Sequence, residues 1–333
     1  MPQPANETKT APPQDRIHDV LIIGGGIAGL SAAIYTTRER LGTLILEKLL
    51  PGGQILTTAR VENYPGFPEA IGGMELADRL SEQATRFGAE IVNQSQVTRL
   101  VPAGEGGSRT LDAFVGATRY RGRCAILCVG SEYRKLDVPG EKRLTGYGVS
   151  YCGTCDAPFY RGKHVVVVGG GNTALDEGLH LLKFAGKVTF VVLANEFTGA
   201  RISIDALKTQ GDRVAARFSS AVAEIVGDKK VEGVRVRNIE TGREDVVPCD
   251  GVFVFIGLTP LTGFLKGAVE LDERGFIRTH ACTLQTSLPG VWAAGDARAG
   301  ALKQAATAAG DGVVAALMAK EYLQPHASPE AQA

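Results

Sequence analysis

The residues best suited to chemistry stand together near the middle of the chain, where two residues separate Cys152 from Cys155 and Asp156 follows at once. Two thiols at this spacing can close a small disulfide ring. A thiolate of such a pair can attack a partner's disulfide, and the second thiol then resolves the mixed disulfide. An adjacent carboxyl could move the proton that this exchange takes up or releases. The spacing therefore predicts a redox-active pair with an acid–base partner.

Zinc sites use the same two-residue spacing, but a structural zinc ion normally needs two such pairs. No other two cysteines of this chain repeat the spacing, so we favour redox chemistry and expect no metal site. Cys124 and Cys128 flank the apolar residues 125–127 and would lie about 13 Å apart along a strand, too far to pair. We expect both to be buried core cysteines.

Length, charge and cysteine content limit the class of protein. The 333 residues are enough for two domains with separate cores. Basic and acidic residues both number 36, giving a formal net charge of +0, so no basic surface argues for a nucleic-acid or lipid partner. No apolar run reaches the length of a membrane span. The start of the chain has no signal pattern, so we expect a cytoplasmic protein, in which a close cysteine pair is more often catalytic than structural.

A glycine-rich turn with a strand before it and a helix after it precedes the cysteine pair. It follows the buried strand 19–23 and runs from Gly24 to Gly29. In this fingerprint the first glycine permits the tight turn, Gly26 lets a pyrophosphate approach, and the last lets helix pack on strand. The helix N-terminus then faces the phosphates. Glu47 ends the next strand, 23 residues after Gly24, where a ribose-binding acid is expected, so we predict a dinucleotide site here.

A second turn of the same kind, from Gly169 to Ala174, follows the strand 163–168. The strand after its helix should end in an acid that binds a ribose or in arginines that bind a 2′-phosphate. It ends instead in residues 192–195, Val-Leu-Ala-Asn, although Glu196 and Arg201 stand a little further on. Two interpretations stay open: an apolar rim that suits a flatter, less polar group, or a retained fold element without a ligand.

Further along, Gly295-Asp296 ends another strand before an alanine-rich helix, expected over 303–318, so one more carboxylate could meet a nucleotide there. The whole pattern predicts an α/β protein with two Rossmann-like three-layer ββα nucleotide-binding domains, the second inserted into the first.

As a set, these residues resemble the thioredoxin reductase family in its low-molecular-weight flavoprotein form. The resemblance covers about residues 19–322. It rests on the following motifs, in order: Gly24 to Gly29, Gly52-Gly53-Gln54, Glu62-Asn63-Tyr64-Pro65-Gly66, Gly148-Val149-Ser150 leading to the cysteine pair, Gly169 to Ala174, and Ala294-Gly295-Asp296 with Gln304-Ala305.

The resemblance implies an FAD-binding domain made of residues 15–134 and 249–322. It also implies an inserted domain of pyridine-nucleotide type, residues 135–248, which carries the cysteine pair. Residues 1–14 and 323–333 are expected to be a disordered leader and a flexible tail. Family members are homodimers whose inserted domain rotates. One orientation exposes the pair to a thioredoxin-like protein, and the other presents nicotinamide to flavin.

The resemblance also assigns roles to residues. Cys155 would be the cysteine nearer the flavin, Cys152 would attack the partner's disulfide, and Asp156 would donate and accept the proton.

For the cofactors, the resemblance makes Glu47 the ligand of the adenosine ribose. It brings Asn63 and Gln304 near the flavin ring and Asp296 to the ribityl-phosphate part. The full set expected to bind FAD is Gly24, Gly26, Ala28, Gly29, Glu47, Gly53, Gln54, Asn63, Gly130, Asp296, Gln304 and Ala305. The set expected at a second dinucleotide is Gly169, Gly171, Asn172, Thr173 and Ala174.

The chain departs from the family at the donor site. Members that use NADPH carry a His-Arg-Arg-x-x-x-Arg pattern, whose positions here are Val192, Leu193, Ala194 and Thr198. Each lost charge-assisted hydrogen bond to the phosphate costs roughly 1.5–3 kcal/mol, so NADPH should bind far more weakly. Lys303 also stands where an arginine usually precedes the glutamine.

We therefore expect the electron donor to differ from ordinary NADPH, as in relatives served by a second FAD or by a ferredoxin-type protein. The alternatives are an NADH- or NADPH-dependent thioredoxin reductase and a flavin-binding redox sensor without fast turnover. Turnover with a thioredoxin-like substrate separates the enzymes from the sensor.

Overall fold

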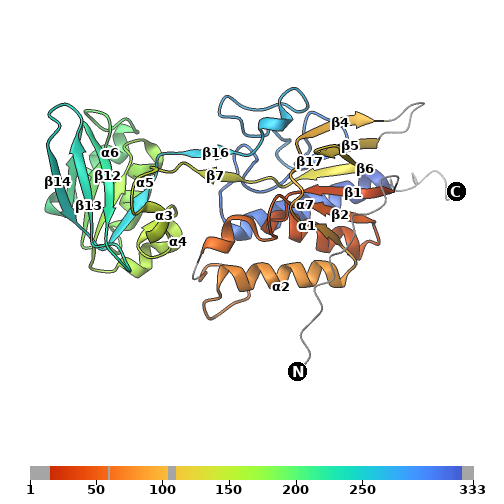
Figure 1. The fold of residues 1–333 in the computed structure, drawn as a ribbon, viewed down its shortest axis with the longest axis horizontal. Coiled ribbons are helices and arrows are strands. Elements are labelled where there is room, and N and C mark those ends of the chain that lie inside the picture. The colour runs from red at the N-terminus through yellow and green to blue at the C-terminus, as the bar shows by residue number, and fades with distance from the viewer. Residues whose placement is uncertain (1–15, 59–60, 104–109, 325–333) are drawn as a thin grey trace. The chain divides into compact units, whose positions relative to one another are not determined.

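The computed structural model describes residues 16–58, 61–103 and 110–324. The expected leader, all but the first two residues of the expected tail and the glycine-rich segment 104–108 lie outside the described residues. The described chain divides into two compact units (Figure 1). The first comprises residues 16–58, 64–131 and 260–324, and the second comprises Val61–Asn63 and Glu132–Thr259. Both units are α/β and the second is inserted into the first, which confirms the predicted fold class.

The first unit is built on a seven-stranded sheet in the order β3-β2-β1-β6-β5-β4, with β17 also paired to β6. Parallel pairing joins β1, β2, β3, β6 and β17, while β4, β5 and β6 form an antiparallel meander. The strands are β1 (Ile17–Ile23), β2 (Thr43–Leu46), β3 (Glu90–Val92), β4 (Arg99–Ala103), β5 (Thr110–Val115), β6 (Thr118–Leu127) and β17 (Val291–Ala293). Because β1 is covered on both faces, its residues 20–23 form a continuous apolar run rather than an alternating pattern.

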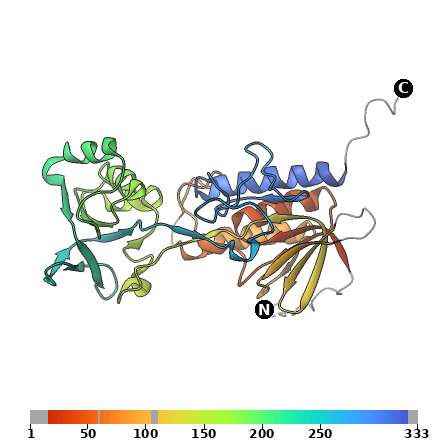
Figure 2. The ribbon, with the colours of Figure 1, turned by 90° about the horizontal axis from the view of Figure 1, so that it is seen from above.

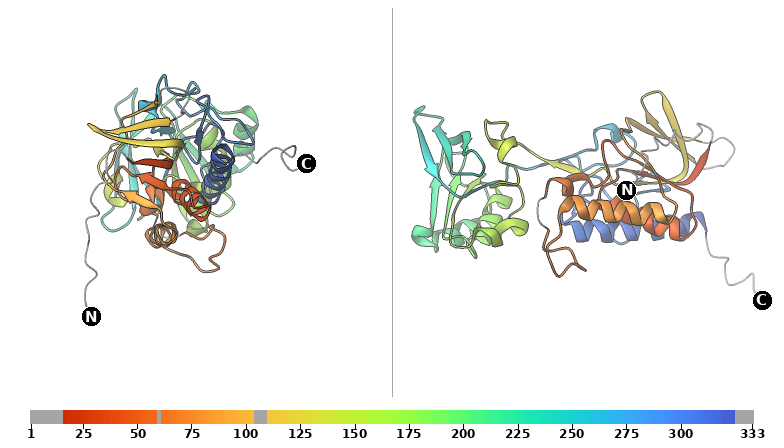
Figure 3. Two further views of the ribbon diagram at one scale, coloured as in Figure 1. Left: turned by 90° about the vertical axis from the view of Figure 1, so that its right-hand side faces the viewer. Right: turned by 60° about the horizontal axis from the view of Figure 1, so that its bottom comes forward.

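Three helices cover one side of this sheet: α1 (Ile27–Arg38), α2 (Gly73–Arg86) and α7 (Ala305–Leu323) (Figure 3). The helices α1 and α7 run side by side in close contact (Figure 2). The last helix begins two residues later than expected and continues past Met318. Lys303 has a positive φ of 59°, and Gln304 is extended, so the helix cannot start before Ala305.

The second unit has three layers. A parallel sheet in the order β11-β10-β9-β15-β8 lies between an antiparallel sheet, β12-β13-β14, and a layer of helices. The parallel strands are β8 (Val149–Ser150), β9 (His164–Val168), β10 (Lys187–Val191), β11 (Val214–Arg217) and β15 (Gly251–Val254). The antiparallel strands are β12 (Ser220–Val226), β13 (Gly233–Asn238) and β14 (Glu244–Pro248). The helix layer contains α4 (Gly153–Asp156), α5 (Asn172–Leu181) and α6 (Arg201–Lys208), whereas α3 (Glu141–Leu144) packs against β12.

The expected boundary at residues 248 and 249 is wrong by one strand. The apolar strand β15 was assigned to the first domain, but it pairs in parallel with β9, Val252 opposite Val166, and with β8 on its other side. After the antiparallel hairpin the chain therefore returns to the parallel sheet of the second unit. The chain passes between the units at a two-stranded sheet of β7 (Ser131–Tyr133) and β16 (Leu258–Pro260).

The contact between α1 and α7 generates a stability prediction. A Cβ atom at Gly312 would clash with the carbonyl oxygen of Ala28, whereas a Cβ at Gly310, on the same helix, would meet no atom within 4 Å. Gly312→Ala should therefore lower the free energy of unfolding of the first unit by about 1–3 kcal/mol through overpacking. Gly310→Ala should raise it by about 0.5–1 kcal/mol through helix propensity. Urea unfolding followed by the fluorescence of the single tryptophan, Trp292 in β17, measures both changes. Equal stabilities for the two variants would contradict this account of the interface.

Candidate active site

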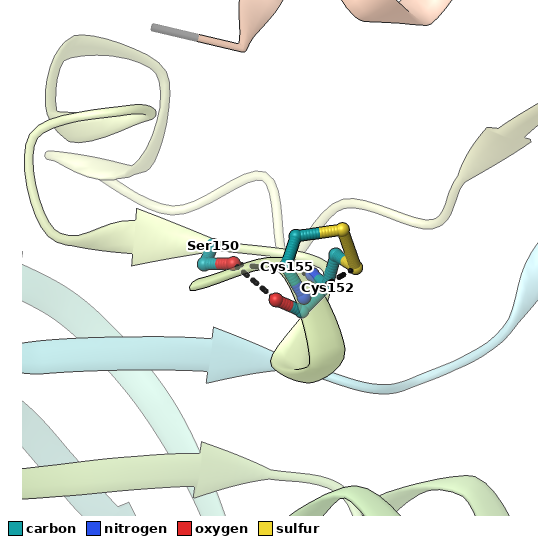
Figure 4. Close-up of a disulfide and its surroundings, with 3 residues drawn as sticks. All are labelled: Ser150, Cys152 and Cys155. Carbon is teal, nitrogen blue, oxygen red and sulfur yellow. Dashed lines mark hydrogen bonds between the residues drawn. A yellow bond between two sulfur atoms is a disulfide. The ribbon is translucent and has the colours of Figure 1, made fainter. Parts of the chain in front are cut away.

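The cysteine pair lies where β8 leads into α4, in residues 150–156, which we call the redox turn, and its two sulfurs form the expected disulfide (Figure 4). Cys152 is the N-cap of α4, its Sγ accepts a hydrogen bond from Cys155 N at 3.2 Å, and the two Cα atoms are 5.3 Å apart. The Ser150 hydroxyl accepts from Cys152 N at 3.1 Å and donates to Cys152 O at 3.2 Å. The strand end and the helix start are therefore held in one geometry around the disulfide.

Asp156 ends α4 directly after the pair. Burial raises the pKa of its carboxyl, and an interaction with the Ser150 hydroxyl opposes this shift only in part. Removing a carboxylate from water disfavours its charged form, so Asp156 keeps its proton to higher pH than an exposed aspartate. This is the property needed by a group that gives a proton to a thiolate.

A buried carboxylate supports the strand that leads into Cys152. Glu141 is 4 % exposed, and its two oxygens accept hydrogen bonds from Leu136 N at 2.9 Å and from Asp137 N at 2.7 Å. The hydroxyl of Tyr151 donates to the same carboxylate at 2.8 Å, and the Lys135 ammonium lies 3.5 Å from the centre of the Tyr151 ring. Glu141 thus ties the entry segment 135–137 to the residue before the first cysteine.

The first glycine turn joins β1 to α1 with the predicted close approaches. Gly24 has a φ of 104°, and a Cβ there would clash with Cys128 O at the end of β6. A Cβ at Gly29 would clash with Gly24 O, so helix and strand could not pack as they do. The Glu47 carboxylate, at the end of β2, accepts from Gly25 N at 2.6 Å and from Leu49 N at 2.8 Å. The predicted acid therefore lies against the glycine turn.

Two further predicted segments meet this turn. Gly52 N donates to Gly25 O at 2.8 Å, and Gly53 begins the short 3-10 helix Gly53–Thr57. From this helix the Gln54 side-chain amide donates to Ser131 O, directly after Gly130. Segments 52–54 and 130–131, which are far apart in sequence, therefore lie together beside the first glycine turn.

The Gly295-Asp296 turn lies beside α1, because a Cβ at Gly295 would stand 3.0 Å from the Ala28 Cβ. Asp311 of α7 holds this turn: its carboxylate accepts from Gly295 N and from Arg298 Nε, both at 3.1 Å. Burial raises the pKa of Asp296, an effect that the nearby Lys303 cation opposes. Arg298 and Asp311 were not predicted from the sequence; the available signal was an acid inside an otherwise apolar, alanine-rich helix.

Three further residues predicted to bind the flavin cofactor are Asn63, Gln304 and Ala305. Gln304 and Ala305 form the N-cap and first residue of α7, directly after Lys303, whose ammonium donates to Asp296 O. Asn63 belongs to the short segment Val61–Asn63 that groups with the second unit, so its proximity to a flavin ring stays a prediction.

The second glycine turn joins β9 to α5 in the same way. Gly169 has a φ of 131°, and a Cβ there would lie 2.5 Å from Phe255 O and 3.1 Å from the Ala174 Cβ. Alanine is therefore accommodated in the last place of this fingerprint. Gly171 is the N-cap of α5, and Asn172 and Thr173 are its first two residues.

The loop after β10 folds back onto the second turn. Thr198 N donates to Gly170 O at 2.9 Å, and Ala200 N donates to the Asn172 side-chain oxygen at 2.7 Å. Leu193, two residues after the strand, is 65 % exposed, and Arg201 opens α6 as an exposed side chain. The rim of this site is therefore aliphatic at the strand end, and Arg201 follows at the start of the next helix.

Both turns fit the pyrophosphate of a dinucleotide. Above the middle glycines the space is open: a Cβ at Gly26 or Gly171 would find no atom nearer than 3.8 Å. Each turn also leads into the N-terminus of a helix, where unpaired N–H groups attract phosphate. The first turn, with Glu47, Gln54 and Asp296 gathered on it, fits FAD.

The two glycine turns are thus two nucleotide cradles, one in each unit. Together with a cysteine pair on the second unit, they define a flavoprotein disulfide oxidoreductase with two nucleotide-binding domains. Within residues 16–58, 61–103 and 110–324, no helix is long and apolar enough to cross a membrane. The same described residues hold no cluster of three or more His, Cys, Asp or Glu side chains able to bind a metal ion.

Comparison with known proteins agrees with this class. Residues 18–312 match the family described as pyridine nucleotide-disulphide oxidoreductase. A thioredoxin reductase of Listeria monocytogenes is 41 % identical over 312 residues, covering 93 % of this chain and 95 % of the relative. A bifunctional thioredoxin reductase/thioredoxin of Mycobacterium leprae is 39 % identical, covering 98 % of this chain and 70 % of the relative. The crystal structure of thioredoxin reductase from Streptococcus pyogenes superimposes with a TM-score of 0.87 at 37 % identity, covering 92 % of this chain and 98 % of the other.

The chain therefore belongs to the pyridine nucleotide-disulphide oxidoreductase family and, within it, to the thioredoxin reductases.

The Glu141 contacts predict a local effect on the redox turn. In Glu141→Gln the side-chain NH2 group would face a backbone N–H of Leu136 or Asp137, leaving a buried donor unpaired at a cost of about 1–3 kcal/mol. Amide hydrogen exchange in peptides covering residues 133–152 should become about ten- to a hundredfold faster, as measured by mass spectrometry. Lys142→Gln, which changes the exposed neighbour on α3, is the matched control and should leave exchange unchanged. If amide exchange in Glu141→Gln were as slow as in the wild-type protein, Glu141 would not support the redox turn in the way described.

Proposed function

We propose that this protein is a pyridine-nucleotide-dependent thioredoxin reductase, which passes electrons through FAD and the Cys152–Cys155 disulfide to a thioredoxin-like protein. The observation that carries the proposal is the disulfide itself, on a short turn with a buried carboxyl beside it, in a unit with its own dinucleotide cradle. The fusion of reductase and thioredoxin in the M. leprae relative supports this partner. The comparisons favour a pyridine-nucleotide donor over the second FAD or ferredoxin-type donor expected from the sequence.

The chain's own residues would carry out thiol exchange. Two electrons and one proton convert the disulfide into one thiol and one thiolate. The Cys152 thiolate attacks the partner's disulfide, and a mixed disulfide forms as the partner's leaving sulfur departs as a thiolate. Cys155 then gives its proton to the partner's leaving thiolate and attacks the Cys152 sulfur as a thiolate. This restores the intramolecular disulfide and releases the partner with one thiol and one thiolate. Bound FAD supplies the two-electron chemistry that connects the nucleotide to the disulfide.

The first test is anaerobic turnover of the holoenzyme with NADPH or NADH and a bacterial thioredoxin, following the thioredoxin dithiol. Wild-type protein should turn over. Cys155→Ser should lose disulfide turnover and keep its flavin, because Cys155 lies apart from the FAD cradle in sequence and in unit. Turnover retained by Cys155→Ser would overturn the assignment of the active site. If neither nucleotide reduces the flavin while dithionite still does, the electron donor is a different one. The number of flavins per chain would then be measured next.

Asp156 should set one limb of the pH–rate profile. Its raised pKa keeps the acid form present above the usual range for aspartate, and this form is lost as pH rises through that pKa. If the acid form protonates a thiolate, the wild-type rate should fall over that window. Asp156→Asn should be at least about tenfold slower and should lack this limb. A stopped-flow pH series on both proteins measures the effect, and identical profiles would remove the acid–base role.

The aliphatic rim of the second cradle makes a prediction about the nucleotide. The positions after β10 carry Val192, Leu193 and Ala194, so no side chain there can bind a 2′-phosphate. We expect the KM values of NADPH and NADH to lie within about tenfold of each other. The double variant Leu193→Arg, Ala194→Arg should lower KM for NADPH by about ten- to a hundredfold, because each charged hydrogen bond contributes about 1.5–3 kcal/mol. The KM for NADH is the internal control, and a strong wild-type preference for NADPH would show that another group binds the phosphate.

Assembly as a homodimer stays a prediction from the family resemblance, as does rotation of the second unit between two orientations.

A further inference from the structure

A second carboxyl reaches the redox turn from the helix of the nucleotide cradle. Glu177 lies on α5, which begins at the second glycine turn and packs against α4. Its carboxyl lies so close to Gly153, the first of the two residues between the cysteines, that a Cβ at Gly153 would clash with Glu177 Oε2. The carboxyl therefore fills the space that a side chain at position 153 would take.

The surroundings of this carboxyl favour its protonated form. Glu177 Oε2 is buried, and no described group donates a hydrogen bond to it. Burial raises the pKa of Glu177. His180 and an interaction with Thr154 oppose this shift, and Asp176 adds to it. A buried anionic oxygen without a donor is costly, whereas a neutral carboxyl avoids most of that cost.

We propose that Glu177 is a proton-holding residue of the redox turn, which takes up a proton when the Cys152–Cys155 disulfide is reduced. The proposal rests on the redox role proposed above. Reduction by two electrons and one proton creates one thiol and one thiolate, so a negative charge appears on the turn that Glu177 touches. A new like charge disfavours ionisation of the carboxyl, which therefore binds a second proton from solvent.

The sign of the effect follows from linkage. Glu177 has a higher pKa in the reduced protein than in the oxidised protein. Its contribution to reduction is fully present below the oxidised-state pKa and is lost as pH rises through the reduced-state pKa. Reduction of the wild-type pair should therefore become less favourable with rising pH more steeply than in a protein without this carboxyl.

Other titratable groups surround α5, and the wild-type and Glu177→Gln proteins share all of them. On the elements that pack against α5, and on α5 itself, they are Asp176 and His180 of α5, Asp156 with the two cysteines around α4, Tyr160 of the following 3-10 helix, Arg201, Asp205 and Lys208 of α6, and His164 of β9. A substitution at Glu177 alone removes one titrating group and leaves the others in place.

The test compares wild-type holoenzyme with Glu177→Gln, which keeps the size of the side chain and removes its titration. The matched control is Asp205→Asn, an exposed carboxylate on α6 that pairs with Lys208. Each protein is equilibrated anaerobically with mixtures of reduced and oxidised dithiothreitol between about pH 5 and 9. After alkylation, mass spectrometry of the peptide that contains both cysteines gives the fraction reduced.

The ratio of the wild-type to the Glu177→Gln equilibrium constant should fall by about three- to tenfold across this range, as expected for a carboxyl whose pKa shifts by up to about one unit. The same ratio for Asp205→Asn should stay flat. A flat ratio for Glu177→Gln overturns the proposal, because a purely structural role does not change with pH. A Cys pair that dithiothreitol cannot reduce in any of the proteins would overturn the proposed function as well.

A direct measurement on the wild-type protein serves if Glu177→Gln does not fold. Proton uptake on reduction by dithiothreitol, followed in weak buffer, should exceed that of Gly153→Ala, in which the added Cβ displaces the Glu177 carboxyl from the turn. Equal uptake by the two proteins would overturn the proposal.

Discussion

The structure depends on one close approach of backbone to backbone, made twice. At each dinucleotide turn the first glycine passes so near a carbonyl of a neighbouring segment that no side chain fits: Cys128 O beside Gly24 and Phe255 O beside Gly169. This approach brings the end of one strand against the chain that follows another, at the carboxyl edge of a parallel sheet. Loops from several strands consequently converge there, which is where ligands of open α/β sheets bind. The Glu47 carboxylate and the segment 52–54 reach the first turn by this route.

Burial of carboxyl groups organises the surroundings of the disulfide. Three acids lie on or near the redox turn, each on a different element. Glu141 accepts three hydrogen bonds, from Leu136 N, Asp137 N and the Tyr151 hydroxyl. Asp156 and Glu177 are buried with fewer donors, and burial raises the pKa of both. The turn therefore combines one carboxyl that orients it through hydrogen bonds with two carboxyls whose raised pKa values favour the protonated form.

Much of this arrangement could be predicted from sequence because it is local. A glycine fingerprint, the strand before it and the acid about twenty residues later are all specified within one βαβ unit, and the cysteine pair lies within four residues. Contacts between segments that are distant in sequence leave no such pattern in the order of the residues. The run at β15 is equally apolar in either sheet, so its partner β9 could not be deduced, and the unit boundary was misplaced as a result. Similarly, the pairing of Arg298 with Asp311 depends on how α7 packs, and the contact of Glu177 with Gly153 depends on the packing of α5 against α4.

The difference between backbone and side-chain recognition explains how the second cradle can keep its geometry with an aliphatic rim. The pyrophosphate is bound by backbone N–H groups and by the helix N-terminus, and these require only glycine at the close approaches. Recognition of the ribose or its phosphate depends on side chains after β10, where the chain carries aliphatic residues. Thr198 and Ala200 hold that loop against the cradle through backbone N–H groups, so its position does not depend on the side chains at 192–194. Nucleotide selectivity can therefore change independently of the cradle, and the cradle alone does not identify the donor.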